Sequence, residues 1–261
     1  ILKRTFGHAY NRFGVSGTFP TDETLEILTI QSVLGPKVTQ IEASTLVDSG
    51  TITPMNVKAV ILNHSTGEIN DRLAYIRKMG AGAEAFRYEK EYVQQSDKRL
   101  EFLKKLIDKC DSNTLVLFYT IEYGTKIFEM LKAGLPDKEF FYIDGEVNNK
   151  QRDAIKKEME KTDGKVKVLV ASYGTLSTGV SINALFNVIF ADSAGKSEQI
   201  VIQSIGRALR KHDQKKIATI FDIVDVFDPK ELNNTLYKHF LEREKFYNKR
   251  KYPYKIIKMN L

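Results

Sequence analysis

The sequence predicts an α/β fold in which a parallel β-sheet is covered by helices on both faces. Three observations lead to this fold class. Six short apolar runs have the length and the flanking turn residues of buried strands. Amphipathic helical patterns lie between most of these runs, and such alternation of strand and helix is typical of a parallel sheet. Small polar residues stand at the ends of three runs, where a parallel sheet places its binding edge.

The expected elements follow one another along the middle of the chain. The strands are Val57–Leu62, Thr114–Tyr119, Glu139–Ile143, Val166–Ala171, Asn187–Ala191 and Ile217–Val224. The helices between them are expected at about Asp97–Asp108, Ile121–Lys132, Asn149–Lys161 and Ser197–Arg210. Thr120, Ser172 and Asp192 stand at the ends of the second, fourth and fifth strands, so we expect them at the ligand-binding edge.

The two ends of the chain depart from this alternation. A helix over about Asp22–Leu34 is expected to stop at the breaker pair Gly35-Pro36. The segment Gly50–Pro54 is the expected hinge before the sheet. Near the C-terminus, Glu231–Lys251 has the pattern of one long helix. The expected divisions of the chain are therefore residues 1–53, 54–229 and 230–261.

Composition restricts the class of protein without identifying it. The chain has 261 residues, of which 42% are hydrophobic and 28% charged, an ordinary globular balance. Its net charge of +7 fits an anionic partner. One cysteine, Cys110, excludes an internal disulfide and fits a reducing compartment, so we expect a cytoplasmic protein. No stretch reaches the length of a membrane span. Because no initiator Met is present, we expect the chain to begin inside a domain.

The most informative stretch is Gln203–Arg210, which reads Q-x-x-G-R-x-x-R. Arg207 and Arg210 are three residues apart, so a helix places them on one face. Gly206 lets another surface approach the backbone. Arginine is permanently charged and has a planar fork of donors, which suits phosphate oxygens. Two such side chains one turn apart predict a γ-phosphate site. The alternative is a solvated basic helix face.

A second stretch, residues 168–182, runs from a buried strand into a loop of small hydroxyl residues and glycines. Backbone N–H groups and hydroxyls at a sheet edge suit the phosphates of a nucleotide or a nucleic acid. Alone, the loop is explained equally well as an ordinary Gly/Ser-rich connection. The arginine stretch that follows it makes a phosphate-binding role more specific.

In this order, the two stretches resemble motifs V and VI in the C-terminal half of superfamily 2 helicases. Leu115–Thr120 looks like motif IV of that family. Gly145–Arg152 looks like the family's Gly-to-Arg segment, which precedes the next helix. Ser16-Gly17-Thr18 resembles motif III, near the end of the first RecA-like domain. The resemblance implies the end of that domain over residues 1–53, a second RecA-like domain over 54–229, and a basic helical extension over 230–261.

The resemblance also implies roles for single residues. Arg210 would be the arginine finger that reaches the γ-phosphate across a domain cleft, and Arg207 would support the same phosphate. Gln203 would link this site to the nucleic acid. The residues implied at the nucleotide are Gly179, Ser181 and Gly206. The residues implied to couple hydrolysis to domain motion are Ser16, Gly17 and Thr18. Those implied to contact DNA are Thr120, Ser172 and Thr178.

The chain departs from the family pattern in two ways. Ser181 stands where many members carry Asp, which puts a carboxylate contact to ribose in doubt. The chain also has no G-x-x-x-x-G-K-[ST] loop and no motif II Asp-Glu pair. Ala194–Ser197 imitates part of a phosphate loop, but Phe190 stands where the first glycine would be, and Ser197 is better explained as a helix cap. We therefore expect ATP and Mg²⁺ to be held mainly by a first domain, and this chain alone to hydrolyse ATP negligibly.

Other polar residues give no metal or nucleophile signal. The four histidines, His8, His64, His212 and His239, lack the spacing of metal ligands. Cys110 has no catalytic partner in the sequence pattern. Asp222, Asp225 and Asp228 follow or end an apolar strand, and we interpret them as surface and capping groups rather than magnesium ligands. No metal site is predicted.

The C-terminal extension combines a basic tract, Lys249-Arg250-Lys251, with aromatic residues. The aromatic residues are Tyr237, Phe240, Phe246, Tyr247, Tyr252 and Tyr254. Such a mixture suits a nucleic-acid strand, with charges on phosphates and rings on bases. An amphipathic helix that packs its rings on the sheet explains the pattern equally well. Both interpretations stay open.

Together these expectations describe the C-terminal part of an ATP-dependent DNA helicase that remodels branched DNA in recombination and repair. The expected partners are DNA and the first RecA-like domain. One alternative is a non-catalytic nucleic-acid-binding module, which would not need two arginines aimed at a γ-phosphate. Another is a different motor with the same core, such as an RNA helicase.

Overall fold

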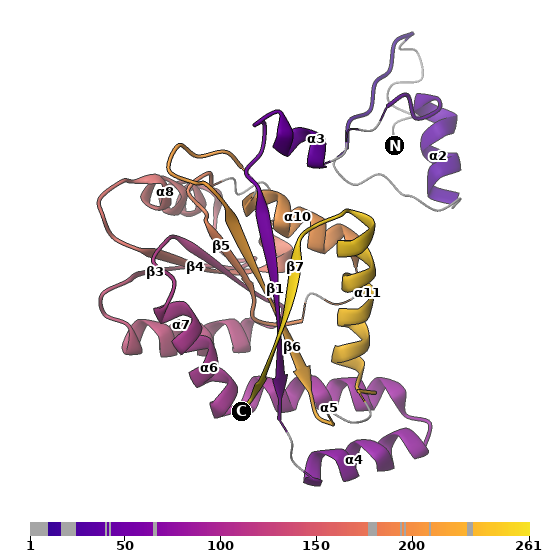
Figure 1. Cartoon of the computed structure of the whole chain (residues 1–261), viewed down its shortest axis with the longest axis vertical. Helices are drawn as coiled ribbons and strands as arrows, with labels where there is room; N and C mark the ends of the chain where they lie inside the picture. Colours follow the sequence, from indigo (N-terminus) through magenta and orange to yellow (C-terminus); the bar gives the residue numbers. More distant parts are fainter. Residues whose placement is uncertain are drawn as a thin grey trace.

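The computed structural model has a seven-stranded sheet at its centre (Figure 1). It describes residues 10–16, 25–39, 41, 43–64, 67–176, 182–193, 195, 197–208, 210–228 and 232–261. The strands are β1 (Met55–Asn63), β2 (Thr114–Phe118), β3 (Glu139–Ile143), β4 (Lys167–Ser172), β5 (Asn187–Phe190), β6 (Ala218–Val226) and β7 (Tyr254–Asn260). Their order is β3-β4-β2-β5-β6-β1-β7, and every neighbouring pair is parallel. The predicted fold class is confirmed.

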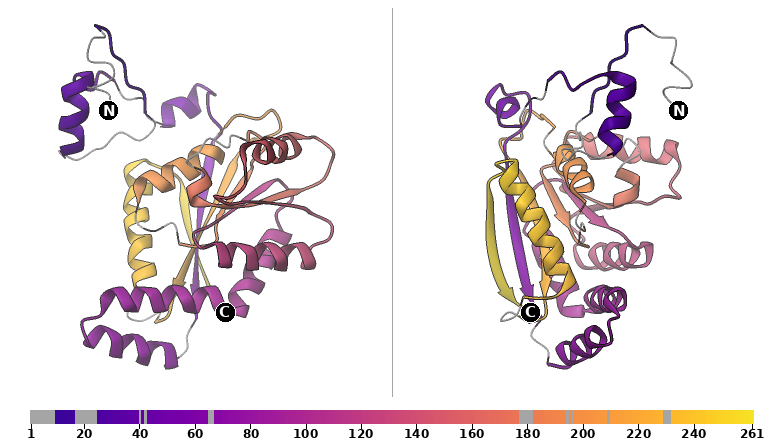
Figure 2. Two further views of the ribbon diagram at one scale, coloured as in Figure 1. Left: turned by 180° about the vertical axis from the view of Figure 1, so that it is seen from behind. Right: turned by 90° about the vertical axis from the view of Figure 1, so that its right-hand side faces the viewer.

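Helices cover both faces of the sheet, as the alternation predicts (Figures 1 and 2). Successive residues of a strand point to opposite faces. Leu115 and Leu117 of β2 therefore join one core cluster, whereas Val116 and Phe118 join the other. The helices that contribute to the first cluster are α8 (Asn149–Glu160), α10 (Glu198–Ala208) and α11 (Thr235–Lys249). Those that contribute to the second are α6 (Asp97–Asp108) and α7 (Ile121–Gly134).

All six predicted strands are present, but the seventh is not predicted by the sequence patterns. The expected long helix over Glu231–Lys251 is wrong at both ends, because α11 is shorter and β7 follows it. The turn between them places Lys251 at a φ of 54°, the left-handed region. β7 pairs with β1, with Tyr254 beside Val57. Its partner is near the other end of the chain, and most of its residues are exposed, so it has no buried apolar run to reveal it.

The longest helices absent from the prediction are α4 (Gly67–Lys78) and α5 (Gly82–Gln95). The buried carboxylate of Glu89 on α5 accepts hydrogen bonds from the backbone nitrogens of Thr235 (2.9 Å) and Leu236 (3.0 Å). A carboxylate at a helix N-terminus satisfies unpaired N–H groups and complements the helix dipole. This tertiary contact stabilises the N-terminal end of α11 at Thr235.

The N-terminal part leads into the sheet through two short helices. α2 (Leu25–Leu34) stands apart from the sheet in the views of Figures 1 and 2, and none of its residues is buried. Residues 22–24 of the expected helix lie outside the described residues. α3 (Ala43–Asp48) precedes the predicted hinge, where Gly50 has a φ of 65°. Within the described part of the chain, no helix is long and apolar enough to cross a membrane.

Candidate nucleotide and nucleic-acid site

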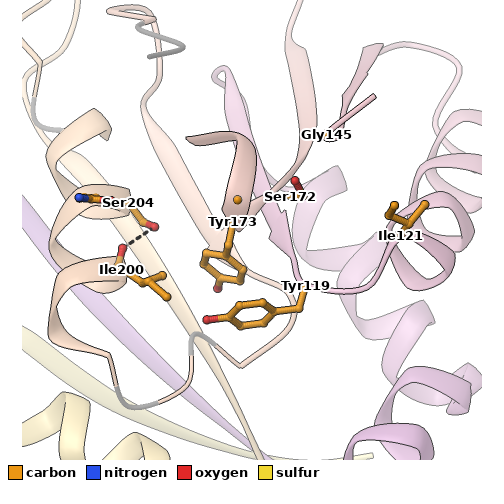
Figure 3. Close-up of a pocket in the computed structure, with 9 residues that line it drawn as sticks. Tyr119, Ile121, Gly145, Ser172, Tyr173, Ile200 and Ser204 are labelled. Carbon is orange, nitrogen blue, oxygen red and sulfur yellow. Dashed lines mark hydrogen bonds between the residues drawn. The ribbon is translucent and has the colours of Figure 1, made fainter. Parts of the chain in front are cut away.

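A pocket of about 460 Å³ lies near the ends of β2, β3 and β4, with α10 on its other side (Figure 3). Its wall includes Tyr119, Gly145, Ser172, Tyr173, Gln203 and Ser204. The fold thus brings together Ser172 and Gln203, two predicted site residues from separate motifs. Thr120 stands between the pocket residues Tyr119 and Ile121 and is exposed. The pocket occupies the edge at which a parallel sheet is expected to bind its ligand.

Part of the polarity at this edge is used by the protein itself. The hydroxyl of Ser172 accepts a hydrogen bond from the backbone nitrogen of Thr175 (3.4 Å), in the short helix α9 (Tyr173–Leu176). The hydroxyl of Ser204 donates to the carbonyl of Ile200 at 2.8 Å. Gln203 is half-buried and belongs to the pocket lining.

A tyrosine pair and a buried carboxylate support one side of the pocket. The rings of Tyr119 and Tyr173 lie 4.4 Å apart between centroids (Figure 3). The Tyr173 hydroxyl donates to the carbonyl of Asp192 (3.0 Å), and Gln94 donates to the Asp192 carboxylate (3.1 Å). Burial raises the pKa of Asp192 despite the nearby Lys90 cation. Asp192 lies just beyond the end of β5, as predicted, but it is 2% exposed and ties β5 to its neighbours rather than lining the pocket.

The prediction that both arginines lie on one helix is also wrong. α10 ends at Ala208, so it contains Arg207, and Arg210 lies in the segment that follows. Arg207 is half-buried, whereas Gly206 and Arg210 are exposed. Burial lowers the pKa of Arg207, and the charge of Arg210 lowers it further. The two positive charges therefore repel one another.

The predicted site residues lie at two different edges of the sheet. Thr120 and Ser172 lie where strands end. Arg210 lies between α10 and the start of β6, at the edge where strands begin. The basic tract Lys249–Lys251 lies near that same edge, because β7 follows it and runs parallel to β1. Helix α10 connects the two edges. Its residue Gln203 lines the pocket, and Arg210 follows the C-terminal end of the helix.

Two aspartates on β6, Asp222 and Asp225, form buried ion pairs. Asp225 accepts hydrogen bonds from Arg99 (2.7 Å) and pairs with His64 at 2.8 Å. Asp222 accepts two bonds from Arg243, at 2.8 and 2.9 Å. The interpretation of Asp222 and Asp225 as surface or capping groups is therefore wrong. Sequence patterns missed both arginine partners, which stand on helices that look solvated.

The C-terminal aromatic residues pack inside the protein. Phe240, Phe246 and Tyr247 are buried in the core cluster beneath α11, and Tyr247 donates to Asp222 at 2.8 Å. This favours the packing interpretation for these rings over base stacking. Lys249 and Lys251 are exposed, and the guanidinium of Arg250 lies 5.7 Å from the centre of the Phe246 ring.

Several predicted residues fall outside the described part of the chain, namely Gly17, Thr18, Thr178, Gly179 and Ser181. Ser16 is described and exposed. Ser197 accepts a hydrogen bond from the backbone nitrogen of Ile200 (3.4 Å), so its predicted role as a cap of α10 is confirmed.

Comparison with protein families gives a match to the helicase conserved C-terminal domain over residues 98–212. These residues contain β2 to β5, α10, Arg207 and Arg210. The ATP-dependent DNA helicase UvsW of Enterobacteria phage T4 is 31% identical over 263 residues, covering 96% of this chain. The chain spans 49% of the length of that relative.

Comparison with solved structures also gives a match to UvsW. The crystal structure of T4 UvsW matches 80% of this chain with a TM-score of 0.62 and 27% identity, over 42% of the UvsW chain. The ATP-dependent Type ISP restriction-modification enzyme LlaBIII, solved bound to DNA, matches 88% of this chain with a TM-score of 0.61. That match covers 17% of the enzyme at 15% identity, so it concerns the fold alone.

Proposed function

This chain carries the C-terminal domain of a superfamily 2 helicase, and on that premise we propose that it is one half of an ATP-driven DNA motor. Residues 54–229 are the second RecA-like domain, residues 1–53 belong to the end of the first domain and the linker, and residues 230–261 extend the second domain. ATP and Mg²⁺ bind in the cleft between the two domains and are held mainly by the first. The phage relative is named as a DNA helicase, so DNA is the proposed track. Branched DNA is the proposed substrate, as the sequence resemblance implies.

One observation carries this proposal. Arg210 is exposed directly beyond α10, while Gln203 of the same helix lines the pocket at the strand ends. Helix α10 and the segment directly after it thereby connect a cation that can reach a phosphate with a pocket beside Thr120 and Ser172. When the cleft closes, Arg210 stabilises charge on the transferring phosphate and Arg207 supports it. Thr178, Gly179, Ser181 and Gly206 complete the nucleotide and DNA contacts, and Ser16, Gly17 and Thr18 pass the motion to the first domain.

The test compares ATP hydrolysis by this chain with hydrolysis by the protein extended upstream through a phosphate-loop domain. Negligible turnover by the chain alone and DNA-stimulated turnover by the extended protein are expected. Robust hydrolysis by the chain alone would contradict the proposal. DNA binding without turnover in the extended protein would favour a non-catalytic binding module, and competition between forked DNA and RNA separates a DNA motor from an RNA helicase.

The basic tract gives a prediction about salt dependence. Each lysine that neutralises a phosphate contributes about 0.9 to the slope of log K against log salt concentration. The double variant Lys249→Ala/Lys251→Ala is therefore expected to reduce that slope by roughly 1 to 2, measured by DNA-binding titrations from low to moderate salt. Substitution is preferable to deleting residues 247–261, because that deletion would remove buried Tyr247 and strand β7.

The matched control is Lys105→Ala/Lys109→Ala, two exposed lysines at the end of α6. This control should leave the slope unchanged. Equal slopes in the wild type and the tract variant would exclude Lys249 and Lys251 from the DNA surface.

A further inference from the structure

The backbone of Arg210 is held from two sides. Its carbonyl oxygen accepts a hydrogen bond from the hydroxyl of Thr53 (3.2 Å) and another from the ammonium group of Lys215 (2.7 Å). The two donors stand on separate segments, before β1 and before β6. Thr53 is 3% exposed and Lys215 is 7% exposed, whereas the Arg210 side chain is exposed. Two buried donors thus fix the peptide group from which an exposed guanidinium extends.

Both donors are themselves firmly placed. The residue after Thr53, Pro54, accepts a hydrogen bond from the backbone nitrogen of Ala218 (2.8 Å), which joins the starts of β1 and β6. The ammonium group of Lys215 lies 5.6 Å from the centre of the Phe186 ring. Burial lowers the pKa of Lys215 to about 8, partly opposed by the Glu160 carboxylate, so the group is mostly protonated at neutral pH. Its hydrogen bond to the carbonyl is therefore charge-assisted and short.

Thr53 belongs to the segment Gly50–Pro54, which the sequence predicts as the hinge before the sheet. The hinge thus has a direct hydrogen bond to the backbone of the residue that carries the proposed finger. A catalytic group must be held to within a fraction of an ångström, and a shift of about 1 Å can cost roughly a hundredfold in rate. A hinge that moves during domain closure is therefore able to change the position of this guanidinium.

We propose that Thr53 and Lys215 are positioning residues, which hold the Arg210 backbone so that the conformation of the hinge determines how far its guanidinium reaches into the cleft. This inference rests on the proposed function, because it deepens the role assigned to Arg210. It assigns a regulatory contact to the hinge, beyond its connection of two domains. Both residues donate to the carbonyl of Arg210 rather than to its guanidinium, so both act through the Arg210 backbone.

The first arm of the test measures DNA-stimulated ATP hydrolysis in the extended protein. Thr53→Val removes the hydroxyl with little change in shape, and Thr53→Ser retains it. We expect Thr53→Val to lower kcat about 3- to 10-fold with little change in the KM for DNA, and Thr53→Ser to recover most of the loss. Lys215→Met should also lower kcat, and Lys215→Arg should restore part of it. Thr51→Val is the control, since Thr51 is an exposed neighbour bonded to Ser49.

The second arm uses this chain alone and does not depend on ATP. Trypsin cleaves after Arg210, at the carbonyl that both donors hold. Thr53→Val should raise the initial cleavage rate at this bond several-fold, with the other cleavage sites and the melting temperature little changed. If the extended wild type is active, and Thr53→Val changes neither its kcat nor the rate of cleavage after Arg210, the positioning role is overturned. An inactive extended wild type would refute the proposed function, while the cleavage comparison would still decide whether Thr53 holds the Arg210 backbone.

Discussion

Replacing Arg210 with Ala is expected to lower the kcat of DNA-stimulated ATP hydrolysis by about a thousandfold or more in the extended protein. An arginine finger stabilises the negative charge that develops on the transferring phosphate, and water replaces a guanidinium poorly in a closed cleft. Arg207, half-buried on α10, remains in this variant but stands three residues earlier in the chain. DNA affinity should change little, because Arg210 lies at the opposite edge of the sheet from the pocket that contains Ser172.

The measurement is steady-state hydrolysis at saturating DNA, together with a DNA-binding titration. Lys211→Ala is the matched control, since it removes an exposed positive charge next to Arg210 and should leave kcat within about twofold. Arg210→Lys keeps the charge but loses the fork of donors, so it should stay strongly impaired. Turnover like that of the wild type in Arg210→Ala would mean that another residue stabilises the phosphate.

Replacing Arg99 with Met is expected to destabilise the domain by about 3–5 kcal/mol. Arg99 and Asp225 are both fully buried, and Arg99 also donates to the carbonyl of Ala191 at 2.8 Å and to the Tyr123 hydroxyl. Without Arg99, the Asp225 carboxylate stays in the interior with the His64 ring, at 2.8 Å, as a side-chain hydrogen-bond partner. The cost of a buried, poorly compensated charge exceeds that of an ordinary cavity.

The measurement is urea unfolding of this chain. The control is Arg87→Met, because Arg87 forms an exposed ion pair with Glu91 at 3.8 Å, and such pairs contribute about 0–1 kcal/mol. The double variant Arg99→Met/Asp225→Leu should recover part of the lost stability, since it removes both charges. Equal unfolding free energies for Arg99→Met and Arg87→Met would show that the buried pair is not a main stabilising contact.

The same pair gives a dependence on pH. Burial would raise the pKa of Asp225, but the Arg99 cation and then His64 outweigh it and hold the value at about 2, below the ordinary 3.8. A lowered pKa contributes stability that is present above about pH 4 and is lost as pH falls toward 2. In Arg99→Met the pKa of Asp225 should rise. Protonation of Asp225 then removes the buried negative charge and reduces the loss of stability in this variant. The difference in unfolding free energy between wild type and Arg99→Met should therefore shrink on acidification.

Sequence patterns did not reveal the buried ion pairs on β6 or the end of α10. In the sequence, Asp222 and Asp225 have the pattern of surface groups. A carboxylate can be recognised as buried only when the cation that pairs with it is known. Arg243 and Arg99 stand on distant helices, and only the packing of those helices against β6 brings the charges together. The end of α10 before Arg210 was similarly missed, since Leu209 and Arg210 continue a good helical pattern while tertiary contacts hold the Arg210 carbonyl elsewhere.

The sequence by itself determined the α/β class, six of the seven strands and the order of the motifs, because apolar runs and their periods are local properties of the chain. The tertiary structure alone decided that β7 closes the sheet beside β1, that the C-terminal rings are core, and that Gln203 and Arg210 serve opposite edges of one sheet. It alone placed the hinge residue Thr53 against the Arg210 carbonyl. These features depend on contacts between segments far apart in the chain, and their energies do not appear in any local pattern.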